Sequence, residues 1–200
     1  MKIYFSYPSK IVLNQFLTTM QNAPFSYTEI GYTKMDNNLN TKNKTKDLLL
    51  RNYTIDYNHA CIGEGTEVWE KARLALKQWK HSPPSFTKIY NNTKGIKEGT
   101  IVAVMIKILG IWWRNSAKIV YVIDKPDCFG FAYGSLLEHA EQGEEAFWIS
   151  RDSTGRITYH LKAFSKPKFW AAKLAYPLTR KYQHKFAQES LQQMKYICTV

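Results

Sequence analysis

The chain has 200 residues, 44% of them hydrophobic and 14% aromatic, which is enough to bury one core and too apolar for a disordered protein. It carries 28 Lys and Arg against 16 Asp and Glu, and the net charge of +12 permits anionic partners. The longest apolar run, 101–113, contains Lys107 and is too short for a membrane-spanning helix. The absence of a signal-peptide pattern and the three well-separated cysteines predict a cytoplasmic protein without structural zinc.

The N-terminal part predicts one short helix followed by irregular chain. Pro8 and Ser9 open the helix, which ends before Pro24 and presents one apolar face made by Leu13, Phe16, Leu17 and Met20. Residues 26–35 are ambiguous and are compatible with a short strand. Residues 36–47 are almost devoid of apolar groups and predict a flexible polar loop within a single domain of residues 1–200.

A strand and a second helix are expected next. Residues 48–62 regain apolar character and alternate, which is typical of a strand. Thr66 is the predicted N-cap of a helix whose apolar stripe continues to Trp79, and Pro83 and Pro84 end it.

The region from 86 to 164 predicts a meander of about six antiparallel strands, because the connections between its apolar segments are short. The expected strands are 87–90, 101–108, 118–123, 129–133, 146–150 and 156–164. In the last of these, Ile157, Tyr159 and Leu161 share one face, so one face of the sheet should be buried and the other wet.

A long amphipathic helix is expected at the C-terminus. Pro167 is predicted to open it, Lys195 lies near its end, and Pro177 should kink it. The resulting fold class is α+β: a curved antiparallel sheet of about six to seven strands wrapped around the long C-terminal helix (a helix-grip arrangement), with two shorter N-terminal helices. A cavity at the mouth of such a sheet is the default ligand site.

Titratable groups gather in the stretch 130–147, where a strand gives way to a loop and then to another strand. A histidine among carboxylates suits acid–base chemistry, so the candidate catalytic residues are His139, Glu141 and Glu144. Glu144 and Glu145 are adjacent on a strand and should point to opposite faces. The candidate ligand-binding residues are Tyr133, His139, Glu141, Glu145 and His59.

Simpler interpretations of the same residues stay open. The glutamates could form a solvated loop in which Glu144 or Glu145 pairs with Arg151 or Arg156. A metal site made by His139, Glu141 and Glu144 is weaker, because no second histidine lies at strand or helix spacing, and no metal or cofactor is predicted. The chain contains no Gly-x-Gly-x-x-Gly, Walker or Gly-x-Ser-x-Gly motif, so nucleotide cofactors and serine hydrolysis are unsupported.

The same stretch resembles the signature of uncharacterised protein family 0548, a domain of unknown function found in bacterial and plant proteins. The matching residues are Gly130, Phe131, Ala132, Tyr133, Gly134, Leu136, His139, Glu141, Gly143, Glu144, Glu145 and Phe147, and the departures are Leu137, Glu138 and Ala140. The resemblance extends to 163–167 and 178–180, more weakly to 57–79, and covers nearly the whole chain. It implies a fold related to the helix-grip (START-like, pollen-allergen-like) superfamily and no established activity.

Three function hypotheses follow. The first is a protein that binds a hydrophobic or amphipathic small molecule in the cavity between sheet and helix, with the polar end of the molecule at Tyr133, His139 and Glu141. The second is a cyclase- or dehydratase-type enzyme that uses His139 and a glutamate in that cavity. The third is a salt-dependent binder of an anionic membrane surface, with nucleic acid a less expected partner because no RNP-like aromatic motif is present.

Overall fold

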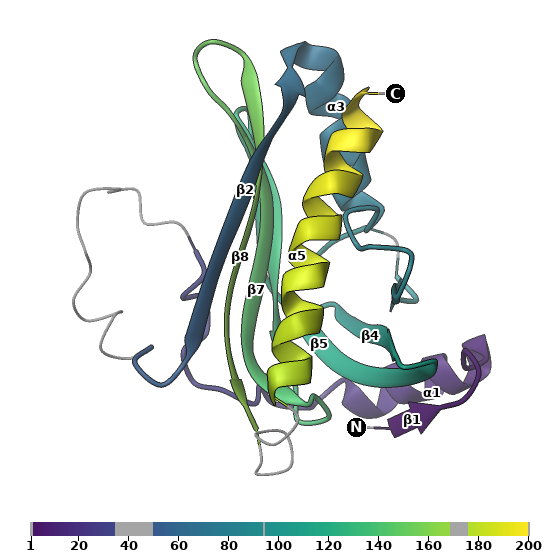
Figure 1. Ribbon diagram of the computed structural model, residues 1–200. Helices are drawn as coiled ribbons and strands as arrows, with labels where there is room; N and C mark the ends of the chain where they lie inside the picture. Colours follow the sequence, from purple (N-terminus) through teal and green to yellow (C-terminus); the bar gives the residue numbers. More distant parts are fainter. Residues whose placement is uncertain (1, 35–49, 94, 169–175, 200) are drawn as a thin grey trace.

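The computed structural model describes residues 2–34, 50–93, 95–168 and 176–199 (Figure 1). Its centre is an antiparallel sheet in the order β2-β8-β7-β6-β5-β4-β3, and β1 pairs with β5 as an eighth strand. The strands are β1 Lys2–Tyr4, β2 Thr54–Glu64, β3 Thr87–Tyr90, β4 Ile101–Ile108, β5 Ile111–Lys125, β6 Cys128–Ser135, β7 Glu141–Arg151 and β8 Arg156–Pro167. The described helices are α1 Lys10–Met20, α3 Gly65–Lys77 and α5 Tyr176–Thr199.

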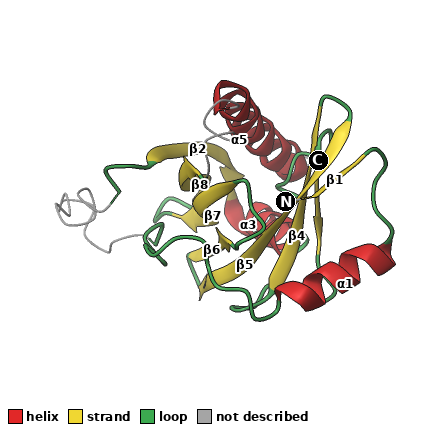
Figure 2. Ribbon diagram, turned by 90° about the horizontal axis from the view of Figure 1, so that it is seen from below, coloured by secondary structure: helices red, strands yellow, loops and turns green. Residues whose placement is uncertain are grey.

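The sheet curves around α5, which lies along its concave inner face (Figures 1 and 2). The helix buries Ala187, Met194 and Cys198 against inner-face residues of the sheet. The hydroxyl of Ser190 lies 2.9 Å from the Tyr159 hydroxyl of β8, so the polar groups in this contact are satisfied. This arrangement confirms the predicted helix-grip architecture.

The two shorter helices cover other parts of the sheet. The apolar stripe of α3 joins the same core as α5, with Trp69, Ala72 and Leu76 buried. Helix α1 packs Leu13 and Phe16 on the opposite, outer face of β4 and β5. The Ser9 side chain accepts a 3.4 Å hydrogen bond from the Val12 backbone N–H, as the predicted helix start requires. The hydrophobic cluster between α1 and the outer face of the sheet also contains Leu17, Ala103, Met105 and Trp112.

Strands β3 and β4 have the bounds that the sequence predicts, and β5 to β8 are longer than predicted. The strand predicted at 48–62 is shorter in the structure, because β2 begins only at Thr54 and ends at Glu64. Residues 26–34 form turns and bends, with no strand assigned to them. The predicted N-cap at Thr66 is wrong, because β2 continues to Glu64, which pairs with Arg156 and serves as the N-cap without a side-chain hydrogen bond. The polar loop predicted at 36–47 lies outside the described residues.

The prediction for Pro167 is also wrong. Pro167 ends β8 opposite Glu141 of β7, beyond the last residue of β8 that pairs with β2, so its missing N–H removes no hydrogen bond on that side. Pro177 is the second described residue of α5, and residues 169–175 before it lie outside the described part of the chain, so the predicted kink stays a prediction.

Candidate functional site

A row of residues crosses the inner face of the sheet beneath the first turns of α5. Their backbones are direct partners on neighbouring strands, and because side chains alternate along a strand, all four point toward the helix. The row runs through Tyr133 of β6, Glu145 of β7, Ala163 of β8 and Asp56 of β2. The Tyr133 hydroxyl donates a 2.6 Å hydrogen bond to Oε2 of Glu145, so the row contains one directly bonded phenol–carboxylate pair.

A cavity of about 160 Å³ lies between this row and α5. One part of its wall is apolar and comes from β4, β8, α5 and the segment before β3, with the side chains of Phe86, Val104, Ile106, Ile108, Leu161, Tyr182, Phe186 and Ala187. The other end is polar and is made by Asp56, Tyr133, His139, Glu141, Glu145, Gln183 and His184. The cavity therefore combines a hydrophobic body with a polar end, as small-molecule sites commonly do.

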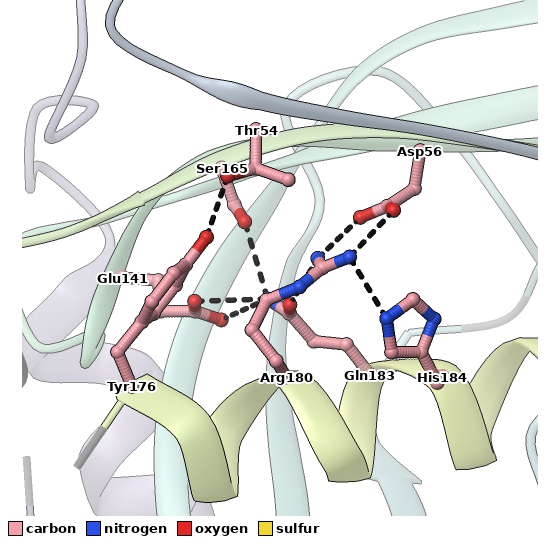
Figure 3. Close-up of polar contacts among 8 residues, drawn as sticks. All are labelled: Thr54, Asp56, Glu141, Ser165, Tyr176, Arg180, Gln183 and His184. Carbon is pink, nitrogen blue, oxygen red and sulfur yellow. Dashed lines mark hydrogen bonds and ion pairs between the residues drawn. The ribbon is translucent and has the colours of Figure 1, made fainter.

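A polar network ties α5 to the sheet beside the cavity (Figure 3). Arg180 of α5 donates two hydrogen bonds, of 2.5 and 2.8 Å, to the two oxygens of Asp56, which is the bidentate geometry of strong Arg–carboxylate pairs. Arg180 also donates to Oε1 of Gln183 at 2.6 Å. The Gln183 amide in turn donates to both oxygens of Glu141 at 2.8 Å and to the Ser165 hydroxyl at 3.1 Å.

The three carboxylates at this end are in different electrostatic situations. The hydrogen bonds from Arg180 hold the pKa of Asp56 below its usual value. Burial raises the pKa of Glu141, although Gln183 opposes the shift. Burial also raises the pKa of Glu145 to about 7, against the hydrogen bond from Tyr133 and with a further push from the charges of Glu141 and Asp56. Glu145 is therefore the carboxyl group that changes protonation near neutral pH.

His139 occupies the loop between β6 and β7 and lines the cavity. Its Nδ1 accepts a 3.1 Å hydrogen bond from the backbone N–H of Glu141, which places the proton of the neutral ring on Nε2. Burial lowers the pKa of His139 to about 4. At neutral pH this histidine is an uncharged hydrogen-bond donor through Nε2 and a weak base.

Glu144 points to the opposite face from Glu145, as strand alternation predicts. Its carboxylate accepts hydrogen bonds from the Tyr27 hydroxyl at 2.8 Å, from the backbone N–H of Gly31 at 2.7 Å and from both the backbone N–H and the hydroxyl of Thr33. Gly134 leaves the space for Tyr27, because a Cβ there would lie 2.0 Å from the phenol oxygen. Glu144 thus fastens the segment 25–34 to the outer face.

His59 also lies on the outer face, exposed on β2, with its ring centroid 5.9 Å from that of His160. The structure accordingly brings together four predicted site residues, Tyr133, His139, Glu141 and Glu145, at one end of the cavity. The side chains of the other two, Glu144 and His59, are directed away from it. Glu144 accepts a hydrogen bond from Tyr27 and Glu145 accepts one from Tyr133, in place of the alternative pairing with Arg151 or Arg156.

Four residues of the site were missed by the sequence analysis: Asp56, Arg180, Gln183 and His184. Asp56 and Arg180 are 124 positions apart, and neither has an unusual local pattern. The one available signal was the family resemblance around 163–167 and 178–180, which includes Ser165 and Arg180 but indicates no contact between them.

Two negative findings apply to the described part of the chain only. It contains no group of three or more His, Cys, Asp or Glu side chains arranged to hold a metal ion. None of its helices combines the length and the hydrophobicity that crossing a bilayer requires.

The fold and site define a helix-grip protein with a partly polar cavity between sheet and helix, a class that comparison with known proteins narrows to one family. The model of the domain of unknown function DUF1990 matches residues 27–193. A UPF0548 protein of Dictyostelium discoideum is 32% identical over 95% of this chain and 93% of its own length. A UPF0548 protein of Arabidopsis thaliana is 30% identical over 69% of this chain and 70% of its own length. The chain belongs to the UPF0548 family.

Solved structures that resemble this one share its fold at low sequence identity. A hypothetical protein of Helicobacter pylori has a TM-score of 0.52 and 11% identity, over 72% of this chain and 86% of that protein. A protein of Arthrobacter aurescens has a TM-score of 0.51 and 12% identity, over 75% of this chain and 88% of that protein. At such identities the likeness concerns the fold alone.

Proposed function

We propose that this protein binds a hydrophobic or amphipathic small molecule in the cavity between the sheet and α5. The observation that carries the proposal is the division of the cavity wall into an apolar part and one polar end. The ligand's apolar body would contact Leu161 and Phe186, and its polar group would meet Tyr133, His139 and Glu141. A cavity of about 150 Å³ holds a benzene molecule, so the space enclosed here accommodates one ring or a short alkyl chain. The three cysteines are all free thiols, which supports a reducing compartment such as the cytoplasm.

The test is organic extraction of the purified protein followed by mass spectrometry, with a variant whose cavity is filled. Ala163 lines the cavity, so Ala163→Leu places added carbon atoms in the space that the ligand would occupy. Thr158→Leu is the matched control, because it adds a leucine on the outer face of the same strand. The proposal predicts an amphipathic molecule in extracts of the wild type and of Thr158→Leu, and much less of it with Ala163→Leu. Equal amounts in all three proteins would contradict it, and so would empty wild-type protein that no amphiphile stabilises against heat.

A second candidate function, acid–base catalysis in the same cavity, is favoured by the Tyr133–Glu145 pair. A carboxyl group whose pKa is about 7 can exist in both protonation states at neutral pH, which general acid–base catalysis requires. His139 is less suited as a base than the sequence suggested, because its pKa is near 4, but its Nε2–H can donate a hydrogen bond to a substrate. For an enzyme, Glu145→Gln should lower kcat at least ~100-fold in a substrate screen while binding persists. For a carrier, no turnover is found and the same variant changes affinity alone.

A further inference from the structure

The charge of the cavity is opposite to the charge of the protein. The whole chain carries +12, with 28 Lys and Arg against 16 Asp and Glu. Yet the described residues that line the cavity include four acidic residues and no Lys or Arg. The carboxylate of Glu144 is used on the outer face, so the carboxylates at the inner, polar end are Asp56, Glu141 and Glu145.

These three carboxylates differ in whether a cation already accompanies them. Asp56 has a bidentate ion pair with Arg180. Glu141 receives two hydrogen bonds from the neutral Gln183 amide, and Glu145 receives one from the neutral Tyr133 hydroxyl. Among the described residues neither of these two glutamates is in an ion pair. The polar end of the cavity therefore holds two acidic groups whose side-chain hydrogen-bond partners among the described residues are neutral. The charge of Arg180, which is paired with Asp56, also acts on Glu141, but the two groups form no ion pair.

Burial of carboxylates beside neutral groups is unfavourable, and a nearby positive charge relieves it. The raised pKa values of Glu141 and Glu145 are the expected consequence of burial, which for Glu141 outweighs the lowering effect of the Arg180 charge. A ligand that carried a positive charge into this end would favour the ionised form of both. A ligand carboxylate or phosphate would meet the charges of Glu141 and Glu145 at close range and be repelled.

We propose, on the basis of the proposed function, that the ligand is a small organic cation: a protonated amine attached to an apolar body of about one ring or a short alkyl chain. The apolar body occupies the part of the cavity lined by Leu161, Phe186 and Ala187. The ammonium group lies between Glu141 and Glu145, where each of its N–H groups can donate to a carboxylate oxygen. The site thus prefers cationic over anionic ligands, although the net positive charge of the protein would attract anions.

The test is calorimetric titration with three molecules that share one alkyl chain: octylamine, 1-octanol and octanoate. At about pH 8 the amine is protonated and Glu145, with its pKa of about 7, is mostly ionised. The proposal predicts that octylamine binds at least ~10-fold more tightly than octanol, the scale of a charge-assisted over a neutral hydrogen bond, and that octanoate binds most weakly. Attraction to the +12 protein as a whole would give the reverse order for the two ions.

Variants locate the charge preference. Glu145→Gln keeps the shape of the side chain and should reduce the octylamine-to-octanol affinity ratio by about 10-fold, while octanol affinity stays nearly constant. Glu67→Gln changes the same charge on an exposed side chain of α3 and should leave the ratio unchanged. Ala163→Leu should weaken all three molecules, which separates binding in the cavity from binding to the surface.

The outcomes separate the two proposals. Octanol or octanoate binding as tightly as octylamine in wild-type protein would overturn the cationic ligand and leave the proposed function standing. That comparison needs no variant, so it holds even where a substitution impairs folding. Failure of all three molecules and of other small amphiphiles to bind would overturn the proposed function itself.

Discussion

Tyr133 and Glu145 stand directly opposite each other on β6 and β7, and the phenol donates a 2.6 Å hydrogen bond to the carboxylate. Both side chains line the polar end of the cavity. A short hydrogen bond to the charged form of a carboxyl group favours that form, whereas burial favours the neutral form. The balance of the two leaves the pKa of Glu145 at about 7.

Removal of the phenol hydroxyl should therefore raise the pKa of Glu145. Tyr133→Phe deletes the hydrogen bond that opposes the effect of burial, and the pKa of Glu145 should rise from about 7 by about one unit. Carboxyl-carbon NMR during a pH titration measures the change directly. Tyr121→Phe on the outer face is the control and should leave the titration of Glu145 in place, and an unchanged or lower Glu145 pKa in Tyr133→Phe would refute the interpretation.

Glu144 should matter for stability and little for the cavity. Glu144→Gln replaces one carboxylate oxygen, which accepts hydrogen bonds from the segment containing Tyr27, Gly31 and Thr33, with an N–H₂ group that cannot accept them. Each buried donor that loses its acceptor lowers the free energy of unfolding by about 1–3 kcal/mol. We expect the free energy of unfolding in urea to fall by about 3 kcal/mol, with affinity for octanol retained. Glu67→Gln, on an exposed side chain in an i,i+4 pair, should change stability by less than about 0.5 kcal/mol. A loss of octanol affinity in Glu144→Gln that exceeds its loss of stability would show that this residue acts in the cavity after all.

His81 should make the protein sensitive to acid. It is fully buried against Phe131 and Phe147, neither ring nitrogen has a hydrogen-bond partner among the described residues, and burial lowers its pKa to about 3. In the unfolded chain its pKa is about 6.5. The stabilisation from neutral His81 is thus complete above pH 6.5 and is lost as pH falls through 6.5 toward 3, by up to about 5 kcal/mol.

Urea unfolding of the wild type and of His81→Leu between about pH 7 and pH 4 tests this expectation. The variant should lose less stability on acidification than the wild type, because leucine takes up no proton in the unfolded state. At neutral pH it should be no less stable, since it buries no unpaired nitrogen. His59→Gln, at an exposed histidine, should follow the wild-type curve, and parallel curves for wild type and His81→Leu would count against the account.

Arg180 and Asp56 should be energetically coupled. Arg180→Gln and Asp56→Asn each remove one partner of a bidentate pair between α5 and β2, and we expect a coupling free energy of about 1–2 kcal/mol. A double-mutant cycle of unfolding free energies measures it. The same double-mutant cycle on the i,i+4 pair of Lys185 and Glu189, both on α5, gives the comparison. Its coupling free energy should be about 0.5 kcal/mol or less. Equal couplings would mean that the network in Figure 3 does not hold α5 to the sheet.

The parts of the fold that local patterns determine were predictable. β3 and β4 have their predicted bounds because Pro84, Gly99 and Gly110 interrupt the chain next to apolar segments. Pro167 and Thr66 were misassigned because their surroundings are set by strand pairing. Pro167 belongs to β8 since it lies opposite Glu141, and Glu64 extends β2 since it lies opposite Arg156.

The candidate site was predictable where it lies on one stretch of chain. Strand alternation separated Glu145 from Glu144, and the carboxylates around His139 selected that residue. Strand alternation alone did not show that Glu145, and not Glu144, is on the inner face, because the inner face is defined by the position of α5. The contribution of Asp56, Arg180 and Gln183 depends on the pairing of β2 with β8 and on the position of α5, which no local pattern reports.

The most direct test of the central claim is an NMR titration of methyl-labelled protein with 1-octanol, a neutral molecule that tests the cavity without the charge preference. The account predicts saturable shifts at the methyl groups of Leu161, Val104 and Ala187, which line the cavity, and little change at Ile55, which is 48% exposed on the outer face. Ala163→Leu should abolish these shifts. Shifts that fail to saturate, or that are as large at Ile55 as at Leu161, would contradict the claim that this protein binds small amphipathic molecules between its sheet and its C-terminal helix.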